Sequence, residues 1–216
     1  MTSLSLGRAR LADRASTADE LRTAGVLAFV AGATFLIGTM VAASIAAGYD
    51  SHDAAISDLG VIAETAALFK ALLIVVGLSD LVAGVLLYRA WRRPSVLAAF
   101  VAGGLGAVGA GAFALDHGGI HSLFALGAFL GFNVEALACA GCLSGPMRWI
   151  SLLAGIVGLG YVVLMVVGDA GNAWVFGAIG HGGSERMIAY PAMLWLLAFS
   201  GYLSAGAGRR EDSPRS

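Results

Sequence analysis

The side chains that could do chemistry begin with a polar stretch at residues 49–60, Y-D-S-H-D-A-A-I-S-D-L-G. It contains three aspartates, a histidine and two serines between two long apolar runs. Asp58 could serve there as a base or a ligand, and Ser57 beside it is a candidate catalytic residue. A structural interpretation stays open, in which Asp50 or Ser51 caps a short helix that the closing glycine ends.

A second polar stretch contains Asp116, His117 and His121, whose H-x-x-x-H spacing would place two imidazoles on one face of a helix. Such a pair could bind zinc with His181 or His52 as third ligand, as in a metal-dependent membrane hydrolase. His121 is accordingly also a candidate catalytic residue. Two glycines between the histidines favour a tight turn and hydrogen-bonded loop histidines instead. We therefore expect no cofactor, and zinc at His117, His121 and His181 is the alternative.

A third group, Glu185, Arg186 and Tyr190, opens the last apolar run. Arg186 is a lone cation among acids and histidines, so we predict that it pairs with Asp58. This pair would hold residues 49–60 against the last helix. A contact with an anion or a lipid headgroup is the alternative, which makes Asp58, Arg186 and Tyr190 candidate substrate-binding residues.

Two acids, Asp80 and Glu135, lie inside apolar runs, at nearly equal depth if both runs cross a membrane in the same direction. Charges at such depth are costly and are usually paired or functional. If the two carboxylates face one another, one of them should be protonated. They could then form a proton relay or a cation site in a proton- or cation-coupled transporter. Separate polar contacts to other helices are the alternative.

The composition shows which elements must position these residues. Of the 216 residues, 58% are hydrophobic and only 12% are charged, whereas soluble domains carry about a quarter charged residues. We therefore predict an all-α fold, a polytopic transmembrane bundle of six helices. Thr17 and Glu20 have capping-box spacing, which predicts that the first helix begins near Ala18. The six predicted spans cover residues 24–48, 65–89, 95–115, 121–143, 148–168 and 186–206.

The basic residues are unevenly divided between the two sides of this bundle. The positive-inside rule makes the side with more arginines cytoplasmic, and with it both the N-terminus and the C-terminus. We expect a cytoplasmic N-terminal segment (1–22), a transmembrane domain (23–206) and a cytoplasmic tail (207–216). The excess of arginine over lysine suggests a GC-rich bacterium and hence its cytoplasmic (plasma) membrane. Eleven of the thirteen basic residues fall on this side, namely Arg8, Arg10, Arg14, Arg22, Arg89, Arg92, Arg93, Arg148, Arg209, Arg210 and Arg215.

Two cysteine and glycine patterns are interpreted as packing. Cys139 and Cys142 form a C-x-x-C inside an apolar run, without a second pair or a neighbouring strand. Gly104, Gly106 and Gly109 form G-x-G-x-x-G, but a dinucleotide site would need a preceding strand. Glycines at such spacing let membrane helices approach closely. The formal net charge of −1 argues against a nucleic-acid partner.

Short motifs in a fixed order give a resemblance to a known family. I-S-D-L-G is followed by A-L-F at 67–69, H-S-L-F-A begins at 121, and G-S-E-R-M-I-A-Y-P-A-M-L-W covers 183–195. Together, over about residues 20–206, they resemble the prokaryotic six-span family catalogued as domain of unknown function 998. The resemblance implies the topology but no activity. I-S-D followed by glycine after a first span also looks similar to the Frag1/DRAM/Sfk1 group, which is linked to lipid remodelling and membrane trafficking.

Three functions are compatible with these residues. The first is an integral membrane protein that binds or handles a lipid or other amphiphile at a polar mouth on its outer face, with membrane lipids as partners. The second is the metal-dependent hydrolase, and the third is the transporter that would use Asp80 and Glu135. A homodimer could supply further helices for transport. We favour the first function, and with it a protein that is not an enzyme.

Overall fold

The computed structural model describes residues 3–211 of the chain, and the side chains of residues 15–206. Within this part the secondary structure is helical, with no strand. Six long α-helices follow one another, and three of the connections between them contain a 3-10 helix. The long helices are α1 (Ser3–Ile45), α2 (Ala66–Trp91), α3 (Pro94–Ala112), α4 (Gly119–Ala140), α5 (Gly145–Asp169) and α6 (Gly180–Glu211). The 3-10 helices are η1 (Ile56–Gly60), η2 (Leu115–His117) and η3 (Ala173–Ile179).

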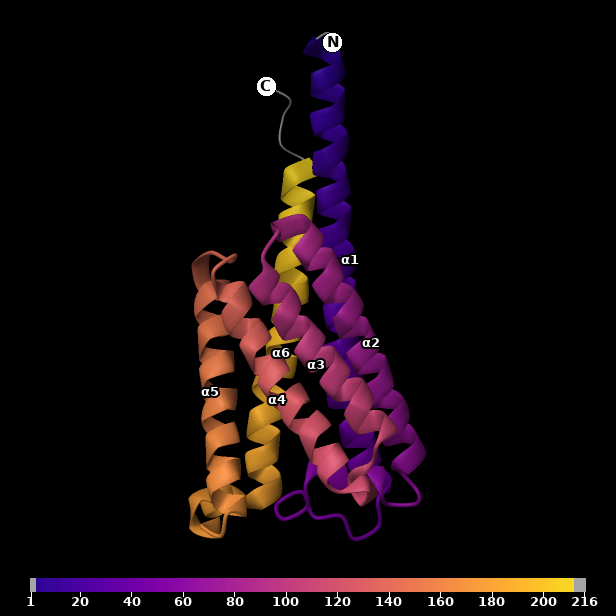
Figure 1. Cartoon of the computed structure of the whole chain (residues 1–216), viewed down its shortest axis with the longest axis vertical. Helices are drawn as coiled ribbons and strands as arrows, with labels where there is room; N and C mark the ends of the chain where they lie inside the picture. The colour runs from indigo at the N-terminus through magenta and orange to yellow at the C-terminus, as the bar shows by residue number, and fades with distance from the viewer. Residues whose placement is uncertain (1–2, 212–216) are drawn as a thin grey trace.

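The two ends of this bundle differ in character (Figure 1). α1 starts and α6 finishes at the same end, which we call the terminal end. The connections that contain η1, η2 and η3 gather at the opposite end, which we call the loop end. Each of the six helices is long and apolar enough to cross a membrane, so the predicted multi-pass all-α fold is confirmed.

The predicted start of the first helix is wrong. α1 begins at Ser3, fifteen residues before Ala18, and continues without a break to Ile45. The segment before Thr17 contains no proline and a single glycine, so nothing in its backbone chemistry ends the helix there. The capping-box spacing of Thr17 and Glu20 therefore falls inside a continuous helix.

Close backbone contact defines the packing of α2, α3 and α4. A Cβ atom added at Gly77 of α2 would collide with the backbone of Gly104 in α3. One added at Gly131 of α4 would collide with the backbone of Gly103 on another face of α3. Small residues allow this approach between membrane helices, where van der Waals contact drives association. The glycine-rich α3 is therefore the packing centre of these three helices, as its composition predicted.

α6 is joined to its neighbours by aromatic and polar contacts. Trp195 is 1% exposed and stacks on Phe199, with 4.8 Å between the ring centroids. Its indole N–H donates to the hydroxyl of Ser151 in α5 at 2.7 Å. The side-chain amide of Asn133 in α4 donates to the carbonyl of Ile188 at 3.0 Å. These bonds satisfy polar atoms that would be costly in hydrocarbon, and they fix how α6 sits against α4 and α5.

The glycine contacts make a direct prediction. Gly131→Ala should destabilise the protein by roughly 1–3 kcal/mol, because its new Cβ has only the backbone of α3 to meet and neither helix can yield locally. The measurement is thermal unfolding in a mild non-ionic detergent.

Gly127→Ala provides the matched control one helical turn away. Its Cβ would come no closer than 3.8 Å to a neighbouring atom, which is ordinary van der Waals contact. We expect the melting temperature of this variant to stay at or above that of the wild type, since alanine favours helix more than glycine does. Equal losses in the two variants would contradict the packing described here.

Candidate functional site

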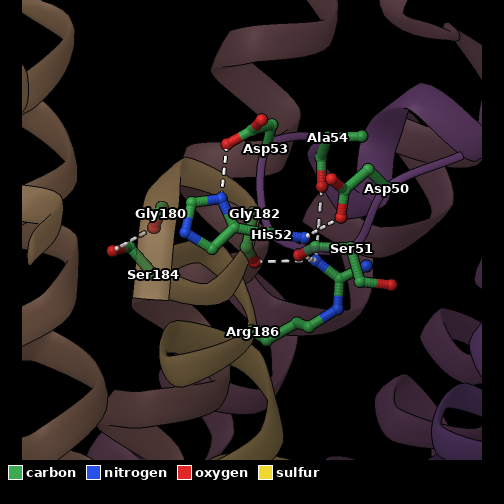
Figure 2. A network of polar contacts seen from close by, with 9 residues as sticks. All are labelled: Asp50, Ser51, His52, Asp53, Ala54, Gly180, Gly182, Ser184 and Arg186. Carbon is green, nitrogen blue, oxygen red and sulfur yellow. Dashed lines mark hydrogen bonds and ion pairs between the residues drawn. The ribbon is translucent and has the colours of Figure 1, made fainter. Parts of the chain in front are cut away.

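Arg186 is the centre of a polar network at the loop end. Its Nη1 donates to the carbonyl oxygens of Ser51 at 3.0 Å and Ala54 at 3.3 Å, and to that of Gly182 at 2.7 Å. Its Nη2 donates to the hydroxyl of Tyr49 at 2.6 Å. Figure 2 shows the guanidinium reaching from α6 to the backbone of the loop. One cation thus fixes residues 49–55, which we call the latch segment, to the first turns of α6.

Tyr49 completes this network from the far side. Its hydroxyl donates to the carbonyl of Ala55 at 2.8 Å while accepting from Arg186. Burial raises the pKa of Tyr49, although the hydrogen bond from Arg186 acts in the opposite direction. The neutral phenol therefore links Arg186 by hydrogen bonds to Ala55, the residue that precedes η1.

The predicted ion pair between Asp58 and Arg186 is wrong. The two side chains are not within ion-pair distance, and Arg186 meets carbonyl and hydroxyl oxygens instead. A carboxylate oxygen of Asp58 accepts the backbone N–H of Ala55 at 2.8 Å. A free N–H at the start of η1 lies within three residues of Asp58, and this local bond was available to it without crossing to another helix. The predicted result, a loop held against the last helix, is present with different partners.

Glycines at the start of α6 let the latch segment lie against the helix. The backbone N–H of Gly182 donates to the carbonyl of His52 at 2.9 Å. A Cβ at Gly182 would collide with the carbonyl of Ala54, and one at Gly180 would collide with His52. Gly180 also has a positive φ of 69°, a conformation that side chains disfavour. Figure 2 shows how closely this turn and the latch segment approach.

His52 lies on the exposed side of the latch. Its Nδ1 is 2.5 Å from a carboxylate oxygen of Asp53, and its own backbone N–H donates to Asp50 at 2.9 Å. The hydrogen bond and charge of Asp53 raise the pKa of His52. The imidazole is thus bound through Nδ1 to a neighbouring acid.

The short I-S-D-L-G segment forms η1, which closes the bundle beside the latch. Ile56 is 3% exposed and Leu59 is fully buried, so both side chains anchor η1 in the apolar interior. Gly60 lies against the ring of Phe69, where a Cβ would come within 2.9 Å of a ring carbon. The predicted short helix is therefore present. It begins at Ile56 rather than at a cap on Asp50 or Ser51, because Ile56 is the first side chain of the segment that can bury itself.

An apolar cavity of about 50 Å³ lies beneath η1, and it is partly open. It is enclosed by side chains of α1, α2, α3, α4 and α6 together with η1 itself. Alanines on α3 and α4 leave this space unfilled, among them Ala110 and Ala125. Phenylalanines of α1, α2 and α4 also line the cavity, including Phe35 and Phe129. Such a cavity is suited to hydrocarbon.

Four polar residues interrupt the apolar wall: Ser57, His121, Asn133 and Glu185. Glu185 is 6% exposed and accepts the backbone N–H of Ile56, which ties α6 to the roof of the cavity. His121 is 3% exposed, and its Nδ1 is 2.8 Å from the carbonyl of Phe113. Its Nε2 is buried and has no hydrogen-bond partner. These residues border the cavity, but its surface is apolar throughout, so none of their polar atoms faces the space.

The three histidines of the zinc alternative are apart. His117 is bound to Asp116 at 2.9 Å, and His181 to Asp169 at 3.2 Å, both at the exposed rim. Gly118 between His117 and His121 has a positive φ of 57°, so the expected tight turn separates the exposed ring from the buried one. Among the side chains of residues 15–206, no group of three histidine, cysteine or acidic residues could hold a metal ion.

Tyr190 lies one turn below the network and meets Phe35 of α1 edge-on, with 6.4 Å between ring centroids. Tyr190 was predicted to bind a substrate together with Arg186, but its ring packs in the interface between α1 and α6. The prediction gave no role to Tyr49, which bonds to Arg186. Its position directly after the first apolar run is the signal in the sequence that could have identified it.

Asp80 and Glu135 are brought together by α2 and α4. Both are fully buried, and one carboxyl oxygen of each lies within 3.3 Å of the point that a Cβ on Gly103 would occupy. Neither lines the cavity, so this pair is a second polar centre, separate from the loop end. The sequence predicted equal depth for the two acids but left open whether they face one another, and the structure brings them together at Gly103.

Comparison with known proteins gives a family but no activity. Residues 29–202 match the model of a family described as "Protein of unknown function (DUF998)", and the chain belongs to this family. No curated protein and no solved structure matches the chain. The similarity to the Frag1/DRAM/Sfk1 group finds no support in these comparisons.

The network at Arg186 predicts which residues are energetically coupled. Tyr49→Phe and Arg186→Gln should each destabilise the protein, and the double variant should lose less than the sum by about 1 kcal/mol, because the two side chains share one bond. The measurement is a double-mutant cycle of unfolding free energies in detergent.

A second cycle, with Asp58→Asn in place of Tyr49→Phe, is the control. Its coupling should be clearly weaker than that of Tyr49 with Arg186, since Asp58 and Arg186 share no direct bond and only bind opposite ends of the Ala54–Ala55 peptide group. Strong coupling of Asp58 with Arg186, and none of Tyr49, would refute the described network.

Proposed function

We propose that this membrane protein binds a single-chain amphiphile at the loop end, with part of its apolar chain in the cavity beneath η1. The observation that carries the proposal is the cavity itself, an unfilled apolar space about 50 Å³ in volume whose wall also contains Ser57, His121 and Glu185. Ligand pockets are lined mainly by apolar side chains, and the surface of this cavity is apolar throughout. The small volume suits a segment of one chain rather than a whole two-chain lipid.

The charged residues at the loop end favour an amphiphile with a neutral or cationic headgroup. Acids predominate among the charged residues of the loop end, including Asp50, Asp53 and Asp58. Arg186 is already bonded to four oxygens of the protein, so it has little capacity left for an anion. This distribution disfavours the anionic headgroup that Arg186 alone would suggest.

The hydrolase alternative has less support. A zinc-dependent mechanism would need three ligands converging on one ion, and the described part of the chain brings no such group together. Ser57 and His121 both line the cavity, but Asp58 is occupied with the backbone of Ala55.

The proposed function predicts selective stabilisation by an amphiphile. Hexadecylamine, added to protein in a bulky-headed detergent, should raise the melting temperature more than palmitate does. A ligand at a concentration 100-fold above its Kd contributes about 2.7 kcal/mol. Ala125→Leu fills part of the cavity and should abolish the shift, as native mass spectrometry of the bound adduct should also show.

Ala138→Leu is the matched control, because Ala138 lies on the same helix and is also partly buried but does not line the cavity. It should keep the shift of the wild type. An identical shift in Ala125→Leu would mean that the amine acts elsewhere on the protein and would refute the proposal.

We further propose that the terminal end faces the cytoplasm of a bacterial cell and the loop end faces outward. The eleven basic residues counted on the terminal side support this orientation. A cysteine placed at exposed Ser51 should then react with an impermeant thiol reagent in intact cells, and one at Ser95 should not. Labelling of the cysteine at position 95 alone would show that the protein has the opposite orientation.

A further inference from the structure

The four carboxyl oxygens of Asp80 and Glu135 are buried and have no hydrogen-bond partner. Both residues are 0% exposed. A buried polar atom without a partner costs free energy, and four such atoms at one place call for a missing partner. Two ionised carboxylates cannot satisfy one another, because each can only accept hydrogen bonds.

The backbone of α3 directs both side chains to the same place. One oxygen of Glu135 and one of Asp80 lie within 3.3 Å of the point that a Cβ on Gly103 would occupy. Gly103 therefore leaves the room in which the two carboxyl groups meet. Any larger residue there would push Glu135 away from Asp80.

The surrounding helices provide no compensating charge. α3 contains no ionisable side chain, and α1 has none between Arg22 and Ile45. α4 contributes the thiol of Cys139, which interacts with both acids and would add negative charge if ionised. Between their ends, α5 and α6 contribute only tyrosines, at positions 161, 190 and 202.

We propose that Asp80 and Glu135 form a proton-binding site inside the bundle, in which a single proton lies between the two carboxyl groups. The proton makes one carboxyl a donor and the other its acceptor, and it removes one of two like charges from a medium of low dielectric constant. A metal cation would need several oxygen ligands and space around it. α3 packs against the pair too closely at Gly103 to leave that space, whereas a proton needs none.

The site should make stability depend on pH in a defined direction. In the unfolded state both carboxyls are ionised at neutral pH, so the folded state holds one more proton. Stability then falls as pH rises, and the unfolding equilibrium constant increases about tenfold for each pH unit. We expect this slope between about pH 6 and pH 8 in unfolding by SDS in mixed micelles, measured relative to Asp80→Asn/Glu135→Gln.

Infrared spectroscopy tests the proton itself. Folded wild type and Glu185→Gln at neutral pH should both show the C=O stretch of a protonated carboxyl, and adding Asp80→Asn/Glu135→Gln to Glu185→Gln should remove it. Glu185→Gln should retain the band, which excludes the other buried acid as its source. If the variant with both amide substitutions fails to fold, the presence or absence of the band in wild type and in Glu185→Gln still tests whether the pair holds a proton.

Three results would overturn the proposal. These are absence of the carboxyl band from folded wild type, equal pH slopes in wild type and a folded double amide variant, and stabilisation by sodium or potassium over choline at constant ionic strength. The last result would assign the pair to a metal cation instead of a proton.

Discussion

Contact between helix backbones in the middle of the bundle is the constraint on which the rest of the structure depends. Glycines on α2, α3 and α4 remove the side chains that would otherwise keep these helices apart, as at Gly77 and Gly131. In lipid there is little hydrophobic drive between helices, so this contact supplies much of their association. It also brings Asp80 and Glu135 together around Gly103, because no Cβ stands between them. The buried acid pair is therefore a consequence of close packing.

The loop end is organised mainly by hydrogen bonds, which two glycines at the start of α6 make possible. Arg186 donates hydrogen bonds to two carbonyl oxygens of the latch segment, which belongs to no helix or strand. Glu185 beside it accepts the backbone N–H at the start of η1. These two neighbours on α6 hold the latch segment and η1 over the cavity. A partly open apolar space beneath a polar cover is the arrangement that binding of an amphiphile requires.

The sequence was sufficient for the number and nature of the spans, since length and hydrophobicity decide them. It also predicted the equal depth of Asp80 and Glu135, because residue counts along two helices of known direction measure depth. The sequence did not predict the partners of Arg186. Whether this side chain meets a carboxylate or backbone carbonyl oxygens depends on the conformation of the loop. That conformation depends on how closely Gly180 and Gly182 let the loop approach α6. The cavity could not be predicted either, because it is the space that the side chains of five helices leave unfilled, and that depends on how all five pack together.

The central claim is that the cavity beneath η1 receives an apolar chain, and photo-crosslinking tests it most directly. A long-chain amine with a diazirine near the end of its chain would be irradiated with protein in lipid nanodiscs, and the modified residues would be located by mass spectrometry. We predict labels on cavity-lining residues such as Phe129 and Met193, suppressed by excess unlabelled amine. Labels confined to lipid-facing residues such as Leu153 and Ile156, unaffected by competitor, would contradict the account.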